Sequence, residues 1–234
     1  MQIKPIFLLA DSQLLFWRGT DKNLLTHLQT LLADKIVEGT TKAAYIGASN
    51  GDDPTFYDIF LAAMAGLDIN DCRMIPVDLS EADHAYLEEA DVVLLAGGSI
   101  KRGWAAFEQN GLIGRIVERY YNGVILIGVS AGAVQLGLRG WPDSGTPHEE
   151  IFHTLQLVPV VIDVHDEPEW SRLKQVVEKV GHPARGVGIS SGGGLILHED
   201  RSLEVLRHAA VEFFAAEDGL KQTLLLPVGP ENPQ

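Results

Sequence analysis

Five short apolar runs alternate with longer amphipathic segments through roughly the first 140 residues, and this alternation constrains the fold more than any other feature of the sequence. Strands of a parallel sheet are covered by helices on both faces, so they read as nearly continuous apolar runs. Strands that alternate with helices form right-handed βαβ units. The sequence therefore predicts an α/β fold, a three-layer sandwich around a mainly parallel sheet. The predicted strands are Ile6–Ala10, Ala43–Ala48, Met74–Val77, Val92–Ala96 and Val124–Val129.

Capping signals mark the ends of the helices expected between these strands. Asp53 followed by Pro54 is typical of a helix N-terminus, and Ser80 favours a second start. Asn122-Gly123 fits a left-handed C-cap. The apolar stripes of the predicted helices are Leu24, Leu25, Leu28, Leu31 and Leu32; Phe56, Ile59, Phe60, Ala63 and Met64; and Ile113, Ile116, Val117 and Tyr120.

Beyond about residue 140 the pattern changes to short strands joined by turns. One helix is expected over Trp170–Val180. No internal repeat or linker interrupts the chain, so residues 1–234 are predicted to form a single domain. The strands predicted here are Val158–Val164, Gly186–Ile189, Gly194–His198, Leu203–Leu206 and Leu224–Val228.

The segment Gly128–Ala133 carries the strongest chemical signal, a G-x-S-x-G pattern directly after an apolar strand. In this context a tight strand-to-helix turn exposes the serine hydroxyl, and the flanking glycines leave space for the neighbouring elements. Backbone N–H groups at the start of the helix would face an oxyanion that forms beside the serine. Ser130 is therefore the candidate nucleophile; the alternative is a serine that only caps the helix.

A serine nucleophile needs a general base, and His165 is the best placed of the eight histidines. It ends the apolar segment Val160–Val164, which delivers it to the carboxyl edge of the strands, where Ser130 is also expected. His27 and His84 lie on predicted helices away from that edge.

The acid that would orient the histidine is left open by the sequence. Asp143 lies in a turn-rich loop between the serine and the histidine, whereas Glu167 forms a His-x-Glu pattern with His165. Glu149 and Glu150 are also within reach. Any of these carboxylates could hold the imidazole tautomer and stabilise its cation.

Gly97-Gly98-Ser99 follows the strand expected to neighbour the serine strand. Paired glycines allow a backbone N–H to approach a reacting carbonyl, so Gly98 and Ala131 are the candidate oxyanion donors. The competing interpretation is a phosphate-binding loop. However, the pair is not part of a G-x-x-x-x-G-K-[ST] or a G-x-G-x-x-G pattern, which are typical of such loops.

The charge balance and cysteine content exclude several other classes of function. With 18 basic and 32 acidic residues the formal charge is −14, which disfavours nucleic-acid and membrane partners. Cys72 is the only cysteine, so neither an intrachain disulfide nor a cysteine metal cluster can form. The apolar start of the chain is too short for a membrane span and lacks signal-peptide features. We expect a cytoplasmic protein that needs neither metal nor cofactor.

Three blocks together resemble the dipeptidase E and cyanophycinase family of serine peptidases: Leu95–Ser99, Gly128–Ala133 and Asp163–His165. The resemblance spans about residues 40–200. It implies a class I glutamine amidotransferase-like fold with a flavodoxin-like core. It also implies Ser130 as nucleophile, His165 as base and Asp143 as acid, with Gly98 and Ala131 as oxyanion donors.

The chain also departs from the family pattern in ways that concern specificity. Ser99 and Ile100 follow the paired glycines in place of the family's usual residues, and Arg172 is the one arginine retained after the histidine block. Residues 190–194 replace the family's acidic pair. Ser99 and Arg172 are the substrate-binding candidates, and the loss of cations predicts that aspartyl substrates are no longer favoured.

These observations predict a serine peptidase-like hydrolase that cleaves a small peptide or amide through an acyl-enzyme. One alternative is a non-catalytic or lapsed family member that binds a metabolite or a protein. Another is an esterase of the α/β-hydrolase type, although that fold usually places its histidine farther from the serine than the 35 positions between Ser130 and His165. The sequence does not indicate the substrate or the oligomeric state.

Overall fold

Seven strands form the central sheet of the computed structural model, which describes residues 3–18, 24–143 and 150–227. The strand order across the sheet is β11-β10-β1-β5-β4-β2-β3. The first five strands of the chain are parallel, β10 is antiparallel to β1, and β11 is antiparallel to β10. The bounds are β1 Ile6–Leu9, β2 Lys42–Ile46, β3 Asp71–Ile75, β4 Val92–Leu95, β5 Ile125–Val129, β10 Gly194–Leu197 and β11 Leu203–Leu206.

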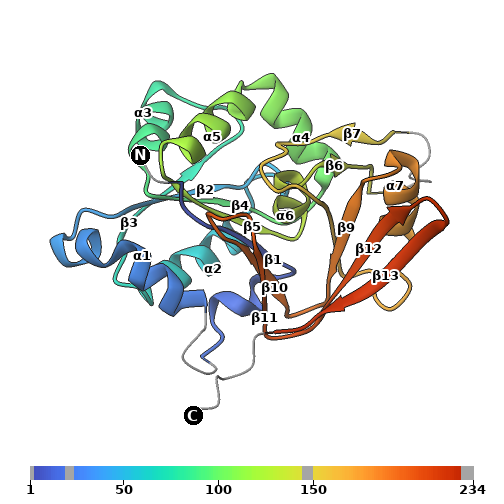
Figure 1. Cartoon of the computed structure of the whole chain (residues 1–234). Coiled ribbons are helices and arrows are strands. Elements are labelled where there is room, and N and C mark those ends of the chain that lie inside the picture. The colour runs from blue at the N-terminus through green and yellow to red at the C-terminus, as the bar shows by residue number, and fades with distance from the viewer. Residues whose placement is uncertain (1–2, 19–23, 144–149, 228–234) are drawn as a thin grey trace, which may run out of the picture.

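Helices cover both faces of this sheet, which confirms the predicted three-layer α/β fold (Figure 1). Alternate side chains of one strand face opposite layers: Phe7 and Leu9 pack with α1 and α2, whereas Ile6 and Leu8 pack with α3 to α6. The helices are α1 Leu24–Glu38, α2 Pro54–Ala65, α3 Glu81–Glu89, α4 Ile100–Gln109, α5 Leu112–Tyr121 and α6 Ala131–Leu136; a short 3-10 helix, η1, spans Ser12–Leu15.

The local signals for α2 and α3 act as the sequence predicts. Asp53 accepts a hydrogen bond from the N–H of Thr55 at 2.8 Å, so α2 begins at Pro54. Ser80 and Asp83 form a reciprocal capping box at the start of α3. The prediction was wrong at β3, which begins at Asp71, because the strand pairs with β2 through residues whose side chains are polar or half-buried. Helix α4 was not predicted.

The strand order explains where a site can form. The order β3-β2-β4-β5 is the 2-1-3-4 order of a flavodoxin-like sheet, and β1 takes the next place beside β5. The chain reverses its direction of progress between β2 and β4, so the loops after these strands open at a topological switch point. Gly97–Ser99 and Ser130 follow two adjacent strands, β4 and β5, as expected.

A second sheet of four strands lies beside the first, with the order β13-β12-β9-β8 (Figure 1). The sequence predicts β8 and β9 but misses β12 and most of β13. Strand β13 is mostly exposed and polar, so it lacks an apolar run, whereas β12 is largely apolar and was missed despite that pattern. The bounds are β8 Val161–Val164, α7 Ser171–Val180, β9 Arg185–Ile189, β12 Ala210–Ala216 and β13 Gly219–Leu225; a short ribbon pairs β6 Arg139–Gly140 with β7 Phe152–His153.

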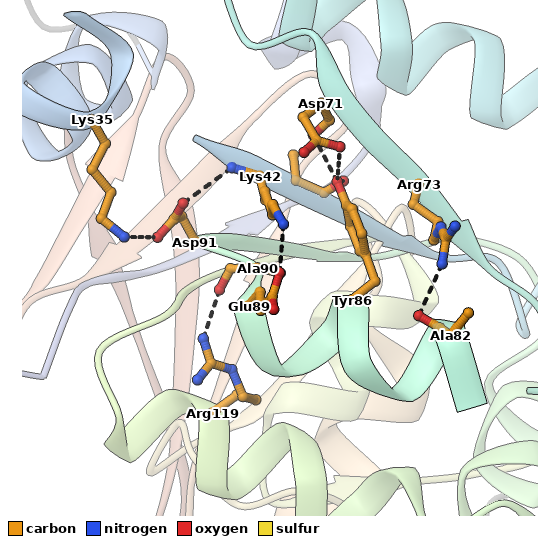
Figure 2. Close-up of polar contacts among 11 residues, drawn as sticks. Lys35, Lys42, Asp71, Arg73, Ala82, Tyr86, Glu89, Ala90, Asp91 and Arg119 are labelled. Atoms are coloured by element: carbon orange, nitrogen blue, oxygen red, sulfur yellow. Dashed lines mark hydrogen bonds and ion pairs between the residues drawn. The ribbon is translucent and has the colours of Figure 1, made fainter. Parts of the chain in front are cut away.

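Polar contacts close the amino-terminal ends of the parallel strands (Figure 2). The backbone N–H of Lys42 donates to Asp91 at 3.0 Å, and the same carboxylate pairs with Lys35 of α1. Arg119 of α5 donates to the carbonyl of Ala90 at 2.7 Å. These contacts join both helical layers to the sheet at its amino-terminal edge. The candidate site residues lie at the opposite, carboxyl edge. No helix in the described part of the chain is long and apolar enough to cross a membrane.

Candidate active site

Ser130 lies in a strained turn between β5 and α6. Its backbone has φ 50° and ψ −112°, a conformation that non-glycine residues rarely adopt, and its N–H donates to the carbonyl of Leu9 at 2.9 Å. The side chain makes no capping hydrogen bond to α6. The conformation therefore does not fit the interpretation of Ser130 as a helix cap.

Close packing explains why glycine follows the serine. A Cβ atom on Gly132 would lie 2.1 Å from the carbonyl oxygen of Leu95, so any side chain would separate α6 from β4. The second glycine of the G-x-S-x-G pattern is therefore needed because α6 packs directly on β4.

The Gly97-Gly98 loop lies directly against the serine. A Cβ atom on Gly97 would lie 3.2 Å from the Cβ atom of Ser130, and one on Gly98 would lie 2.3 Å from the carbonyl oxygen of Ser49. No described residue accepts a hydrogen bond from the N–H of Gly98 or of Ala131. Both donors are therefore available to a ligand beside the serine.

Asp143 holds this loop against α4. Its carboxylate accepts hydrogen bonds from the N–H of Ile100, at 3.0 Å, and from the hydroxyl of Ser99. Arg172 donates to the Asp143 carbonyl at 3.2 Å. No hydrogen bond within the described part of the chain joins Asp143 to His165, so its role as the acid stays a prediction.

His165 follows β8 on an exposed turn with φ 62°. Its N–H lies 3.4 Å from the carbonyl of Ile189, and its Nδ1 atom lies 3.1 Å from the hydroxyl oxygen of Ser191. Among the described residues, no hydrogen bond connects His165 with the hydroxyl of Ser130. The histidine is instead oriented by the loop that follows β9.

Glu167 lies behind this contact. The N–H of Ser191 donates to a Glu167 oxygen at 3.0 Å. Partial burial raises the pKa of Glu167, but this hydrogen bond and the nearby imidazole of His165 lower it below its ordinary value. When the Ser191 hydroxyl accepts from Nδ1–H of His165, Nε2 is left as the basic nitrogen.

Sequence reasoning named Glu167 but missed Ser191. The available signal was the replacement of the family's acidic pair by the residues at 190–194. Of the other two acidic candidates, Glu150 forms an ion pair with Lys101, and Glu149 lies outside the described residues.

Strand β1 joins the serine turn to the loop that carries Ser191. Leu9 accepts from Ser130, the next residue, Ala10, donates to Gly193 at 3.0 Å, and Asp11 accepts from the N–H of Gly192 at 2.6 Å. The predicted nucleophile and the partner of the predicted base thus lie on either side of one strand end. Sequence reasoning did not identify the anchoring role of Asp11.

Asp163 is a buried carboxyl two residues before His165. One oxygen accepts from the N–H of Val164 at 2.9 Å, and the other has no partner among the described residues. Burial raises its pKa to about 7. That value includes a smaller rise from the charge of Asp166 and opposing effects of the Val164 N–H and Arg172, so Asp163 is largely protonated in mildly acidic solution.

Three arginines, Arg102, Arg139 and Arg172, donate hydrogen bonds to backbone carbonyls. Besides Arg172, Arg102 donates to Ser49 through Nε at 3.0 Å and Nη2 at 2.5 Å. Arg139 donates to Leu138 at 2.8 Å. Within the described ranges, no group of three or more His, Cys, Asp or Glu side chains could hold a metal ion.

Comparison with known proteins places these features in a family. The model for peptidase family S51 matches residues 8–205. A peptidase from an acI-B1 actinobacterium is similar in structure, with 15% identity, a TM-score of 0.62 and coverage of 97% of this chain and 95% of that chain. A protein assigned as peptidase E from Listeria monocytogenes EGD-e has 16% identity, a TM-score of 0.64 and coverage of 88% and 99%. At these identities the likeness concerns the fold; no curated protein matches the sequence.

Proposed function

The chain belongs to peptidase family S51 and is a serine-type peptidase, and within that class we propose that it cleaves small peptides or amides through an acyl-enzyme on Ser130. The observation that carries the proposal is the strained serine turn packed against Gly97, with the N–H groups of Gly98 and Ala131 unpaired within the described residues. Strain of this kind is retained where it exposes a reacting group.

The proposed reaction has two acyl-transfer steps. Nε2 of His165 takes the hydroxyl proton of Ser130 as Oγ forms a bond to the substrate carbonyl carbon. The resulting oxyanion is stabilised by the N–H groups of Gly98 and Ala131. The C–N bond then breaks, the imidazolium gives its proton to the leaving amine, and water releases the acyl group by the same path.

The hydrogen bonds favour Glu167 as the acid that orients His165, acting through Ser191, whose N–H donates to Glu167 and whose hydroxyl contacts Nδ1. In this arrangement Asp143 is a positioning residue that holds Ser99 and the oxyanion loop. The role implied by the family resemblance, in which Asp143 is the acid, is the competing proposal. Variants of the two carboxylates distinguish the two proposals.

We also infer that the substrate specificity differs from that of aspartyl-directed family members. A substrate carboxylate that leaves water needs a cation or several N–H donors. Arg172 and Arg102 are already bonded to carbonyl oxygens, and the Ser99 hydroxyl is bonded to Asp143. Peptides with an acidic N-terminal residue are therefore expected to be poor substrates.

The non-catalytic alternative is supported by the lack of a hydrogen bond between His165 and Ser130 in the described part of the chain. Such bonds are often long before substrate binds, so their absence does not argue strongly against catalysis. The family match favours a peptidase over the esterase alternative.

Labelling with a fluorophosphonate tests the proposed function. The wild type should be labelled at Ser130 at neutral pH, and Ser130→Ala should abolish both labelling and dipeptide hydrolysis. Ser202→Ala removes an exposed hydroxyl bonded only to Asp200, so that variant should label normally. A folded wild type that resists the probe would establish the non-catalytic alternative.

A further inference from the structure

A small apolar pocket opens beside the serine turn, on the face of the sheet that carries α1 and α2. Its volume is about 30 Å³, and no charged side chain lines it among the described residues. The walls that concern substrate binding are Leu15, Phe56, Ile59, Ala96, Gly97 and Val129.

The position of the pocket relates it to the reacting group. Val129 immediately precedes Ser130, and Gly97 packs so closely that its Cβ would lie 3.2 Å from the Cβ of Ser130. The pocket is therefore lined by the residue before the nucleophile on β5 and by the residue of the β4 loop that packs against it. It also lies at the ends of β4 and β5, next to the topological switch of the sheet, where α/β proteins bind ligands.

The mouth of the pocket carries an apolar side chain that solvent reaches. Phe56, on the first turn of α2, is 49% exposed, and Ile59 lies one turn farther along the same helix. Two of the lining residues, Ser12 and Tyr45, carry a hydroxyl, and that of Tyr45 accepts a hydrogen bond from the side chain of Asn50 at 2.8 Å. The other lining residues are apolar or glycine, so the walls are mainly hydrocarbon.

We propose that this pocket binds the side chain of the substrate residue whose carbonyl Ser130 attacks, and that it selects a small aliphatic side chain such as that of Ala or Val. The proposal rests on the proposed function. The side chain of that residue begins two bonds from the attacked carbon, which is the closest side chain of the substrate to the nucleophile. A volume of about 30 Å³ suits a few methyl groups and excludes an aromatic ring.

The same walls discriminate against acidic substrates. A carboxylate in this pocket would lose water and find no cation in its lining. Pockets of this kind separate side chains that differ by one methylene about tenfold or more, and they separate a charge from an alkyl group more strongly.

Dipeptides that differ only in the N-terminal residue test the subsite. We expect kcat/KM for Ala- or Val-initiated dipeptides to exceed that for the Asp- and Phe-initiated ones by at least about tenfold. Phe56→Ala should reduce the ratio of Val to Asp by roughly fivefold, because it removes part of the apolar wall. Tyr121→Ala, which removes an exposed aromatic from α5 on the other face, should leave the ratio unchanged.

The outcomes separate the subsite from the proposed function. Normal fluorophosphonate labelling together with fastest cleavage of the Asp dipeptide would overturn the subsite alone. Equal shifts in Phe56→Ala and Tyr121→Ala would do the same, and Ile59→Ala provides an independent change in the wall. Failure of the wild type to label would overturn the proposed function and the subsite with it.

Discussion

The Nδ1 atom of His165 lies 3.1 Å from the hydroxyl oxygen of Ser191, and the backbone N–H of Ser191 donates to Glu167 at 3.0 Å. This relationship joins two strand ends of the second sheet, because His165 follows β8 and Ser191 follows β9. It supplies the imidazole with an acceptor for its Nδ1 proton, which is the function of the acid in a serine triad.

Glu167→Gln and Ser191→Ala are each expected to lower kcat by about 10- to 100-fold with little change in KM, because they weaken an interaction that stabilises the imidazolium in the transition state. Steady-state kinetics with one dipeptide checks this, together with circular dichroism to verify folding.

Asp143→Asn is the matched carboxylate variant. It should lower kcat less than Glu167→Gln, since the amide oxygen can still accept from the N–H of Ile100 and the amide NH2 can donate to the hydroxyl of Ser99. If Asp143→Asn is the more severe of the two and Glu167→Gln is almost fully active, Asp143 is the acid.

Gly132→Ala should lower the free energy of unfolding by more than ~3 kcal/mol, because the new Cβ would collide with the backbone of β4 at 2.1 Å. Urea denaturation measures the change. Gly114→Ala is the control, since Gly114 lies on α5 with nothing within 4 Å of its ideal Cβ. It should stabilise the protein by up to ~1 kcal/mol. Equal stabilities for both variants would contradict the close packing of α6 on β4.

Asp163 should make stability fall as the pH rises. Burial raises its pKa from 3.8 to about 7, so the folded state binds the proton more tightly than the unfolded chain. The contribution is fully present below pH 3.8 and is lost as the pH rises through about 7.

Asp163→Asn removes this titration, so the free energy of unfolding should depend less on pH over that range. At ~1.4 kcal/mol per pKa unit, the difference from wild type is at most a few kcal/mol. Unfolding in urea at a series of pH values measures it, with exposed Asp58→Asn as the control. A profile that is identical in Asp163→Asn and wild type would contradict the raised pKa.

Cys72 should react slowly with iodoacetamide in the folded protein. Burial, with a smaller effect from Asp71, raises the pKa of its thiol to about 11, so little thiolate exists at pH 8. Mass spectrometry should show faster alkylation as the pH approaches 11, and ordinary reactivity in urea. Because Cys72 is the only cysteine, the signal is unambiguous. Rapid alkylation at pH 8 without unfolding would refute it.

The sequence predicted those features that depend on neighbours along the chain. The apolar runs at β1, β2, β4 and β5 mark strands covered on both faces, and Asp53 and Ser80 act through N–H groups two or three residues away. The turn at Ser130 was recognisable for the same reason, since its glycines and its strand are contiguous. Family membership follows from the order and spacing of such local blocks.

The tertiary structure alone decided the partners of the site residues. Asp11 and Gly192 are 181 positions apart, and Ser99 and Asp143 are 44 apart, so no periodicity or spacing connects them. Most of β13 was missed because an exposed edge strand carries a weak apolar pattern. Phe56 and Val129 reach the same pocket from different elements. Side-chain hydrogen bonds and pocket walls depend on distances in space, which the packing of helices on the sheet determines and the local sequence does not.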